Sequence, residues 1–161
     1  MQGIVEQINT SKGGLPKSPV LHAVITTEGI DGDRHKHPQY HGGALKALLL
    51  ITTEVLDELK AKGFSVYPGA MGENLTTRGL DRRSMRPGQR YRAGSVLLEL
   101  TRMRQPCAQL HPYGAGIQNA IFDSSVKAGD TLSPLWGLGG FYASVIQPGE
   151  IQPGDIIALV D

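Results

Sequence analysis

The chain has 161 residues, which is enough for one domain that buries a hydrophobic core without disulfide bonds. Its 16 basic and 15 acidic side chains give a net charge of +1, which argues against nucleic acid as a partner because phosphate backbones require a concentrated basic surface. Because it has one cysteine, no signal-peptide pattern and no segment near the roughly 20 apolar residues that cross a bilayer, the chain is predicted to be cytoplasmic and not membrane-bound.

The first half of the chain alternates predicted strands with loops. We expect strands over residues 2–8, 20–27 and 47–51, because these segments are rich in apolar and β-branched residues and end at turn residues. A helix is predicted over residues 54–62, which place their apolar side chains on one face. Gly63 follows at the position where a left-handed C-cap belongs.

The second half adds more short strands. Residues 91–103 are predicted to form two strands joined by a turn, and further strands are expected over residues 140–146 and 155–160. A short helix is predicted over residues 117–123. The 21 glycines and 10 prolines are spread along the chain, as expected for turns between short strands. This pattern predicts a mainly β protein, either a barrel or a closed sheet, with one or two short helices.

Two polar loops in the first half carry candidate binding residues. Residues 11–17 contain two lysines, and they form either a solvated surface loop or a backbone-and-lysine cradle for an anion. Residues 29–43 are dense in glycine and histidine and have no helical or strand period. The imidazoles of His35, His37 and His41 could bind a metal, but no fourth ligand follows at a recognisable spacing. The other interpretation is that these histidines hold the loop or line a pocket.

A third polar loop is predicted over residues 67–79. Its three glycines permit a close approach between the backbone and a ligand, and Asn74 and Thr76 supply neutral hydrogen-bond donors and acceptors. Turn chemistry alone would also account for this composition.

Cys107 is the only thiol in the chain and therefore cannot form an intramolecular disulfide. Arg102, Arg104 and His111 lie close to it in sequence, and positive charge near a sulfur favours the nucleophilic, metal-binding thiolate. Pro106 ends the strand-like run just before the cysteine and constrains how the thiol leaves it. Two interpretations stay open at this point, a reactive thiol and an inert buried cysteine at a strand end.

In their order along the chain, these motifs resemble the MOSC domain. That domain is found at the C-terminus of molybdenum cofactor sulfurases, in the amidoxime-reducing component and as small stand-alone bacterial proteins. The stand-alone form is the closest in length, so we expect a single MOSC domain over residues 1–161. The matching pieces are Gly13-Gly14-Leu15-Pro16-Lys17, Gly32-Asp33-Arg34 with His41-Gly42-Gly43, Gly69-Ala70-Met71-Gly72-Glu73-Asn74-Leu75, Pro87-Gly88, Pro106-Cys107, Phe141-Tyr142-Ala143-Ser144-Val145, Pro148-Gly149 and Pro153-Gly154-Asp155.

The resemblance implies a closed, distorted β-barrel of the pyruvate-kinase-barrel type. It also implies that the single cysteine either ligates molybdenum in a bound pterin cofactor, molybdopterin, or carries sulfur as a persulfide, and Cys107 matches that position. A thiolate is a soft ligand that suits such a metal. Asn74, in the Gly-Glu-Asn-Leu stretch, matches a contact to the pterin or to its phosphate. Further candidate cofactor-binding residues are Lys17, Arg34 and Lys46 by their charge, Thr76 by its hydroxyl, and His41 as a residue that closes the pocket.

Three functional hypotheses follow. The first is a molybdenum-cofactor protein, which in its more specific form is the catalytic subunit of a reductase for N-hydroxylated compounds such as hydroxylaminopurines. It needs a separate electron-donor protein, because one cysteine cannot hold an iron–sulfur cluster. The second is a sulfur carrier that receives sulfur on Cys107 from a donor protein. The third is a ligand-binding barrel with an inert cysteine. Pro106 precedes Cys107 where the amidoxime-reducing branch commonly has an arginine, which bears on the reductase activity and not on the family. No pyridoxal phosphate site is expected.

Overall fold

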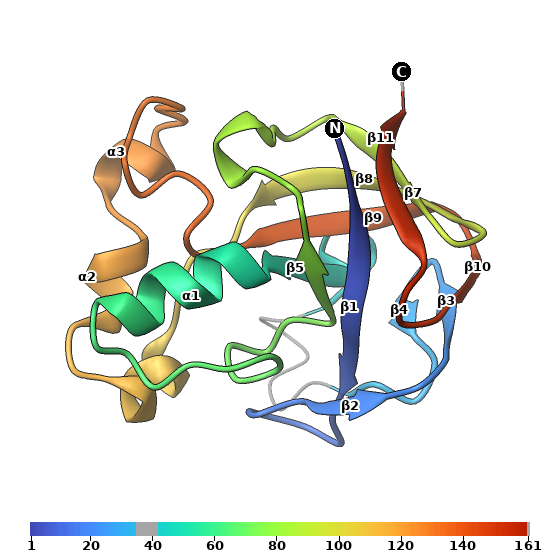
Figure 1. Ribbon diagram of the computed structural model, residues 1–161, viewed down its shortest axis with the longest axis horizontal. Coiled ribbons are helices and arrows are strands. Elements are labelled where there is room, and N and C mark those ends of the chain that lie inside the picture. Colours follow the sequence, from blue (N-terminus) through green and yellow to red (C-terminus); the bar gives the residue numbers. More distant parts are fainter. Residues whose placement is uncertain (35–41, 161) are drawn as a thin grey trace.

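The computed structural model describes residues 1–34 and 42–160, and a closed β-barrel forms its centre (Figure 1). Eight strands are hydrogen-bonded in the order β11-β7-β8-β9-β5-β6-β1-β2, and β11 also pairs with β1, so that all of them except β2 close into a ring. Neighbouring barrel strands are antiparallel, except that β5 and β6 are parallel. The mainly β, closed-barrel architecture predicted from the sequence is confirmed. The barrel strands are β1 (Gln2–Thr10), β5 (Leu48–Thr52), β6 (Leu75–Arg78), β7 (Arg90–Ala93), β8 (Val96–Met103), β9 (Phe141–Gln147) and β11 (Ile156–Val160).

A small second sheet lies beside the barrel. It consists of β10 (Gly149–Ile151), β3 (Ala23–Thr26) and β4 (Gly29–Ile30), whereas β2 (Ser18–Val20) extends the edge of β1. The single strand predicted over residues 20–27 is therefore two strands. The chain passes from one sheet to the other between β2 and β3, so it cannot stay in one continuous ladder.

Three short strands fall outside the predicted strands, namely β4 and β6, which lie in predicted loops, and β10. Their glycine and polar content gives no local strand signal. Strands β6 and β10 are held by partners that are distant in the chain, as when β6 pairs with both β1 and β5, whereas β4 forms a tight hairpin with the preceding strand β3. Long-range pairing of this kind decides the structure of β6 and β10.

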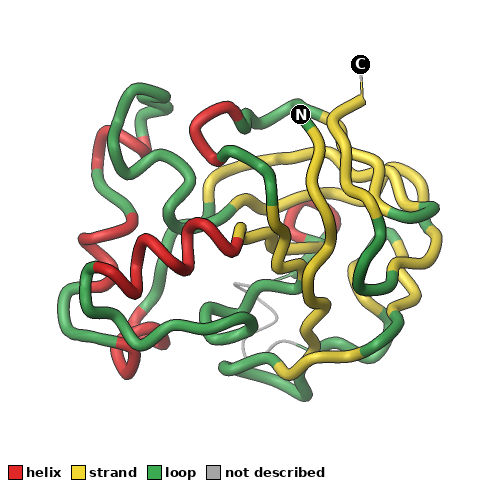
Figure 2. Tube along the Cα trace, viewed as in Figure 1, coloured by secondary structure: helices red, strands yellow, loops and turns green. Residues whose placement is uncertain are grey.

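The helices gather mainly on one side of the barrel (Figure 2). Helix α1 (Thr53–Ala61) confirms the helix predicted over residues 54–62, and the side chain of Thr52 caps it by accepting a 3.1 Å hydrogen bond from the backbone N of Val55. Helix α2 (Ile117–Ile121) corresponds to the predicted short helix. None of the helices in the described part of the chain is long and apolar enough to span a bilayer. The remaining helical segments are α3 (Ser124–Lys127) and the 3₁₀ turns η1 (Ala44–Lys46), η2 (Arg82–Ser84) and η3 (Ala108–Tyr113).

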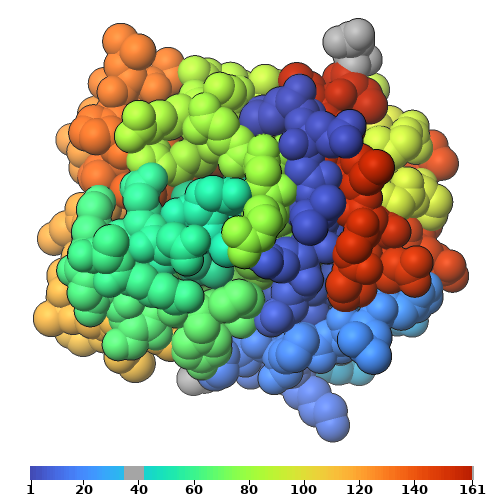
Figure 3. Space-filling view, viewed as in Figure 1, coloured from blue at the N-terminus to red at the C-terminus, as the bar shows by residue number. Residues whose placement is uncertain are grey.

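Strand β5 lies between two hydrophobic clusters, and all five of its residues are buried. Leu48 and Leu50 belong to the cluster inside the barrel, whereas Ile51 belongs to a second cluster formed with α1, α2 and η3. A strand that is covered on both faces has a continuous apolar run instead of an alternating one. On the surface, the first strand β1 (blue) and the last strand β11 (red) lie side by side (Figure 3).

Candidate functional site

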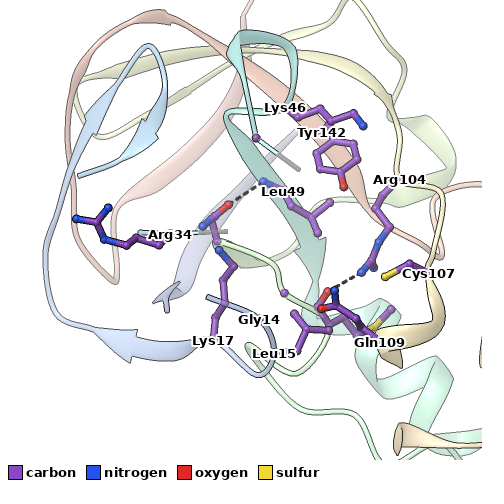
Figure 4. A pocket seen from close by; sticks show the side chains of 14 residues that line it. Gly14, Leu15, Lys17, Arg34, Lys46, Leu49, Arg104, Cys107, Gln109 and Tyr142 are labelled. Carbon is purple, nitrogen blue, oxygen red and sulfur yellow. Dashed lines mark hydrogen bonds between the residues drawn. The ribbon is translucent and has the colours of Figure 1, made fainter. Parts of the chain in front are cut away.

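Cys107 opens on a pocket whose walls come from six separate stretches of the chain, and Figure 4 shows the side chains that line it. Five of the residues predicted as site residues line it together: Cys107, Asn74, Lys17, Arg34 and Lys46. We call it the inner pocket. Its lining residues are Gly14, Leu15, Lys17, Arg34, Gly42, Lys46, Leu49, Met71, Gly72, Asn74, Arg104, Cys107, Gln109 and Tyr142.

Two other predicted site residues are placed differently. Thr76 does not line the inner pocket; it is fully buried behind it. His41 lies outside the described residues, as do the other two histidines of the predicted three-histidine metal site, His35 and His37. Among the residues that are described, no group of three or more His, Cys, Asp or Glu side chains is arranged to hold a metal ion.

Glycines allow two loops to meet at the wall of the inner pocket. Gly69 has φ 91°, and a Cβ there would overlap with the carbonyl oxygen of Lys17, whose backbone N donates a 2.9 Å hydrogen bond back to Gly69. A Cβ on Gly72, at φ 85°, would lie 2.6 Å from Cδ2 of Leu15. These glycines thus accommodate another loop of the chain, where the sequence pattern suggested the approach of a ligand.

A buried polar network fixes one side of the inner pocket. The ammonium of Lys17 lies 2.5 Å from Oδ2 of Asp33, and the two side chains are 6% and 4% exposed. Asn74 donates to the same Oδ2 over 2.9 Å and to the backbone oxygen of Asn9 over 3.3 Å, while its own oxygen accepts from the backbone N of Leu49 over 3.1 Å. The polar groups of Lys17 and Asn74 that line the pocket are therefore already hydrogen-bonded within the protein.

Arg104 is a lining residue that the sequence analysis used only as a nearby charge. Its guanidinium is buried beside Cys107 and donates a 2.9 Å hydrogen bond to the backbone oxygen of Met71 (Figure 4). Burial lowers the pKa of Arg104, whereas Tyr142, Cys107 and Glu73 raise it. The hydroxyl of Tyr142 is directed toward this guanidinium. The position of this arginine between an apolar strand and the lone cysteine was the only sequence signal for a role in the site. The direction of its side chain, into the pocket, is visible only in the fold.

Glu73 carries a buried carboxyl group whose charge acts on Arg104. Its Oε1 accepts hydrogen bonds from the backbone N of Gly69 over 2.6 Å and from the hydroxyl of Thr76 over 3.1 Å, while Oε2 has no hydrogen-bond partner among the described residues. Burial raises the pKa of Glu73, and the hydrogen bonds and the charge of Arg104 oppose that rise. The hydroxyl of Thr76 accepts a 3.1 Å hydrogen bond from the side-chain amide of Asn9, so Thr76 links Asn9 to Glu73.

Cys107 is half-buried and also lines a second, larger cavity, which we call the outer cavity. Strand β8 ends at Met103, so Pro106 is not the residue that ends it; the backbone N of Arg104 still donates to Gly140 over 2.9 Å. Lys46 also lines both cavities, and its ammonium lies 5.2 Å from the ring centroid of Tyr142. The thiol is thus reachable from two sides, which does not fit a core cysteine.

A family model of the MOSC domain matches residues 37–158. This chain belongs to the MOSC domain family. Protein YiiM of Escherichia coli (strain K12) is 30% identical to it over 141 residues, which are 85% of this chain and 58% of that protein. The uncharacterized protein YflK of Bacillus subtilis (strain 168) is 28% identical over 151 residues, which are 91% of this chain and 63% of YflK. The MOSC chain thus spans less than two thirds of the length of these curated relatives.

The crystal structure of YiiM from Geobacillus stearothermophilus superimposes on the MOSC chain with a TM-score of 0.70 and 26% sequence identity. The match covers 100% of this chain and 76% of that one. The predicted family is therefore confirmed, and a solved structure shares the fold.

Proposed function

We propose that this MOSC protein binds a molybdenum–pterin cofactor with Cys107 as the metal ligand, and that it reduces N-hydroxylated compounds with electrons from a separate donor protein. The observation that carries the proposal is the position of the only thiol. It lies half-buried between the inner pocket, which is lined by Arg104, Lys17 and Lys46, and the larger outer cavity.

The donor set of the inner pocket fits such a cofactor. A thiolate is a soft ligand, and cationic side chains suit the phosphate of a pterin. When bound, the group would supply two-electron redox chemistry at the metal. Asp33 already neutralises Lys17, and Figure 4 shows the guanidinium of Arg34 directed away from Cys107. Arg104 is thus the cation of the inner pocket that lies buried beside the thiol.

The volume of the two cavities is the stricter condition for binding such a cofactor. The inner pocket encloses about 50 Å³ and the outer cavity about 840 Å³, whereas sites for small molecules usually measure roughly 300–1,000 Å³. Binding of a pterin therefore requires that the inner pocket widen or that part of the group occupy the outer cavity. The small inner volume favours a second candidate function, in which Cys107 carries a persulfide that it receives from a sulfur-donor protein and passes on by exchange.

Metal analysis tests the first function. The protein and its Cys107→Ser variant would be produced in a host that makes the pterin cofactor, with thermal unfolding as the control that both are folded. We expect near-stoichiometric molybdenum in the wild type and a loss of most of it in the variant. Absence of molybdenum from both proteins would reject the proposal. A mass increase of one sulfur atom on Cys107 would then support the persulfide carrier.

Alkylation of the native protein tests the reactive thiol independently of any cofactor. We expect Cys107 to react without denaturant, and Arg104→Gln to slow the reaction several-fold because the thiolate loses the charge beside it. Arg92→Gln, on the exposed face of β7, removes the same charge elsewhere and should leave the rate unchanged. Reaction only after unfolding would support the inert cysteine of the third hypothesis.

A further inference from the structure

The outer cavity has the size and the walls of a small-molecule site. Its volume of about 840 Å³ lies within the range of such sites. Cys107 lies where it adjoins the inner pocket, and the remaining walls come from the end of β8, from α3 and from the segment that carries Trp136. The lining residues are Lys46, Pro87, Thr101, Arg102, Met103, Gln105, Pro106, Cys107, Ala108, Gln109, Phe122, Val126, Lys127, Gly129, Trp136 and Tyr142.

One wall of the outer cavity is aromatic and held in place. The indole N–H of Trp136 donates a 2.9 Å hydrogen bond to the backbone oxygen of Met85, and its ring packs edge-on against Phe141 with the centroids 6.4 Å apart. Phe122 and Tyr142 add two further rings to the lining. A fixed aromatic wall favours a planar, apolar ligand, because little side-chain freedom is lost when the ligand binds.

The charged lining residues of the outer cavity all have one sign. They are Lys46, Arg102 and Lys127, and no Asp or Glu in the described part of the chain lines it. Arg102 and Lys127 are exposed, and neither forms an ion pair with any acid in the described ranges 1–34 and 42–160. Arginine binds carboxylate and phosphate groups through paired hydrogen bonds. The cavity therefore favours a ligand with an anionic group.

We propose that the outer cavity is the substrate site of this protein, and that it selects planar aromatic molecules bearing a carboxylate or phosphate-like group. The anionic group faces Arg102 and Lys127, the ring packs against the aromatic wall to which Trp136, Phe122 and Tyr142 contribute, and the reacting end points to Cys107. Only the identity of the reacting end, an N-hydroxyl group, rests on the function proposed above. Binding at this site needs neither molybdenum nor a donor protein.

Trp136 is the only tryptophan in the chain, so its fluorescence reports directly on this cavity. The probes are benzamidoxime and its 4-carboxy and 4-phosphono derivatives, titrated into the protein without added metal. We expect saturable fluorescence changes, with an anionic derivative binding about tenfold or more tightly than neutral benzamidoxime. Comparison of the two anionic probes shows whether the cavity prefers a carboxylate or a phosphate-like group.

The decisive variant is Arg102→Gln/Lys127→Gln, which should abolish the preference for the anionic probes and leave the neutral probe within about twofold of the wild type. The matched control, Arg92→Gln/Lys62→Gln, removes the same two charges from exposed positions on β7 and at the end of α1. It should retain the preference.

Equal affinities for all three probes in the wild type, or an equal loss in both double variants, would overturn the proposal. No fluorescence change with any probe would overturn it as well, and it would favour an acidic protein surface as the occupant. Each result is independent of molybdenum content, so failure here is distinguishable from failure of the proposed function.

Discussion

Asp33 accepts hydrogen bonds from three donors at the wall of the inner pocket, and Asp33→Asn tests how strongly this network holds the fold. Its Oδ2 lies 2.5 Å from the ammonium of Lys17 and 2.9 Å from the side-chain amide N of Asn74, and its Oδ1 accepts from the backbone N of Ser11 over 2.9 Å. An asparagine keeps the shape but places an NH₂ group against one of these donors. The substitution also leaves the buried ammonium without its counter-charge.

The expected loss is large because both side chains are nearly inaccessible. Removing one partner of a buried ion pair costs about 3–5 kcal/mol, and each hydrogen bond to a charged group contributes about 1.5–3 kcal/mol. We expect Asp33→Asn to lower the free energy of unfolding by about 3–4 kcal/mol. The control is Glu99→Gln, which breaks the 2.8 Å pair with Arg90, whose side chains are 30% and 49% exposed. An exposed pair of this kind contributes less than about 1 kcal/mol.

Urea unfolding followed by the fluorescence of Trp136 measures both variants, and an unchanged slope against urea would show that only stability changed. The cycle is completed by Lys17→Met and by the double variant Lys17→Met/Asp33→Asn. Once the ammonium is gone, loss of the carboxylate should destabilise the protein less. The sum of the losses of unfolding free energy in the two single variants should therefore exceed the loss in the double variant by about 0.5–3 kcal/mol. A loss below about 1 kcal/mol for Asp33→Asn would refute this reasoning. It would mean that the pair is solvated and that Lys17 is available to a ligand.

Two further substitutions test backbone strain and pH dependence. Gly69→Ala and Gly88→Ala both place a side chain at φ 91°, but only at Gly69 does the new Cβ overlap with a neighbouring loop. Gly69→Ala should therefore lose about 1–3 kcal/mol more than Gly88→Ala in urea unfolding, and equal losses would contradict the close packing of the loops. Burial raises the pKa of Glu6, but hydrogen bonds from Thr53 and Arg78 outweigh it, so the net pKa lies below its usual value of 4.5. A carboxylate with a lowered pKa stabilises the folded state above about pH 4.5, and this contribution is lost as the pH falls through the folded-state pKa. Glu6→Gln should therefore be less stable than the wild type by up to about 1 kcal/mol at pH 7, and the two stabilities should converge in acid. A stability difference that is the same at pH 7 and in acid would argue against this contribution.

Strands with strong local patterns were predictable from the sequence alone. The apolar run at 47–51 and the segments 2–8, 140–146 and 155–160 correspond to β5, β1, β9 and β11. Closure of the strands into a barrel came from the resemblance to the MOSC domain and is confirmed by the pairing of β11 with β1. Strand β6 was missed because Leu75-Thr76-Thr77-Arg78 has no distinctive local pattern and is held between β1 and β5.

The site was predictable in part. Cys107, Asn74, Lys17, Arg34 and Lys46, which were named as candidates from the sequence, line one pocket, and their roles there stay a prediction. What each group does there depends on partners that the sequence does not place beside it. Asp33 lies sixteen positions from Lys17 in the chain, yet it determines that the ammonium is neutralised.

Of the outer cavity only Cys107 and Lys46 were named as candidate site residues from the sequence, because much of its wall comes from β8, from α3 and from a segment around Trp136 to which the sequence pattern assigned no structure. Residue propensities and apolar patterns in the sequence determined several of the strands and the position of α1. The sequence also showed that the one thiol follows a charged strand end. Only the tertiary structure decided that Arg104 turns inward beside Cys107 while Arg102 and Lys127 border an open cavity. The reason is that propensity acts over a few residues, whereas burial and charge pairing are set by contacts between segments that barrel closure brings together.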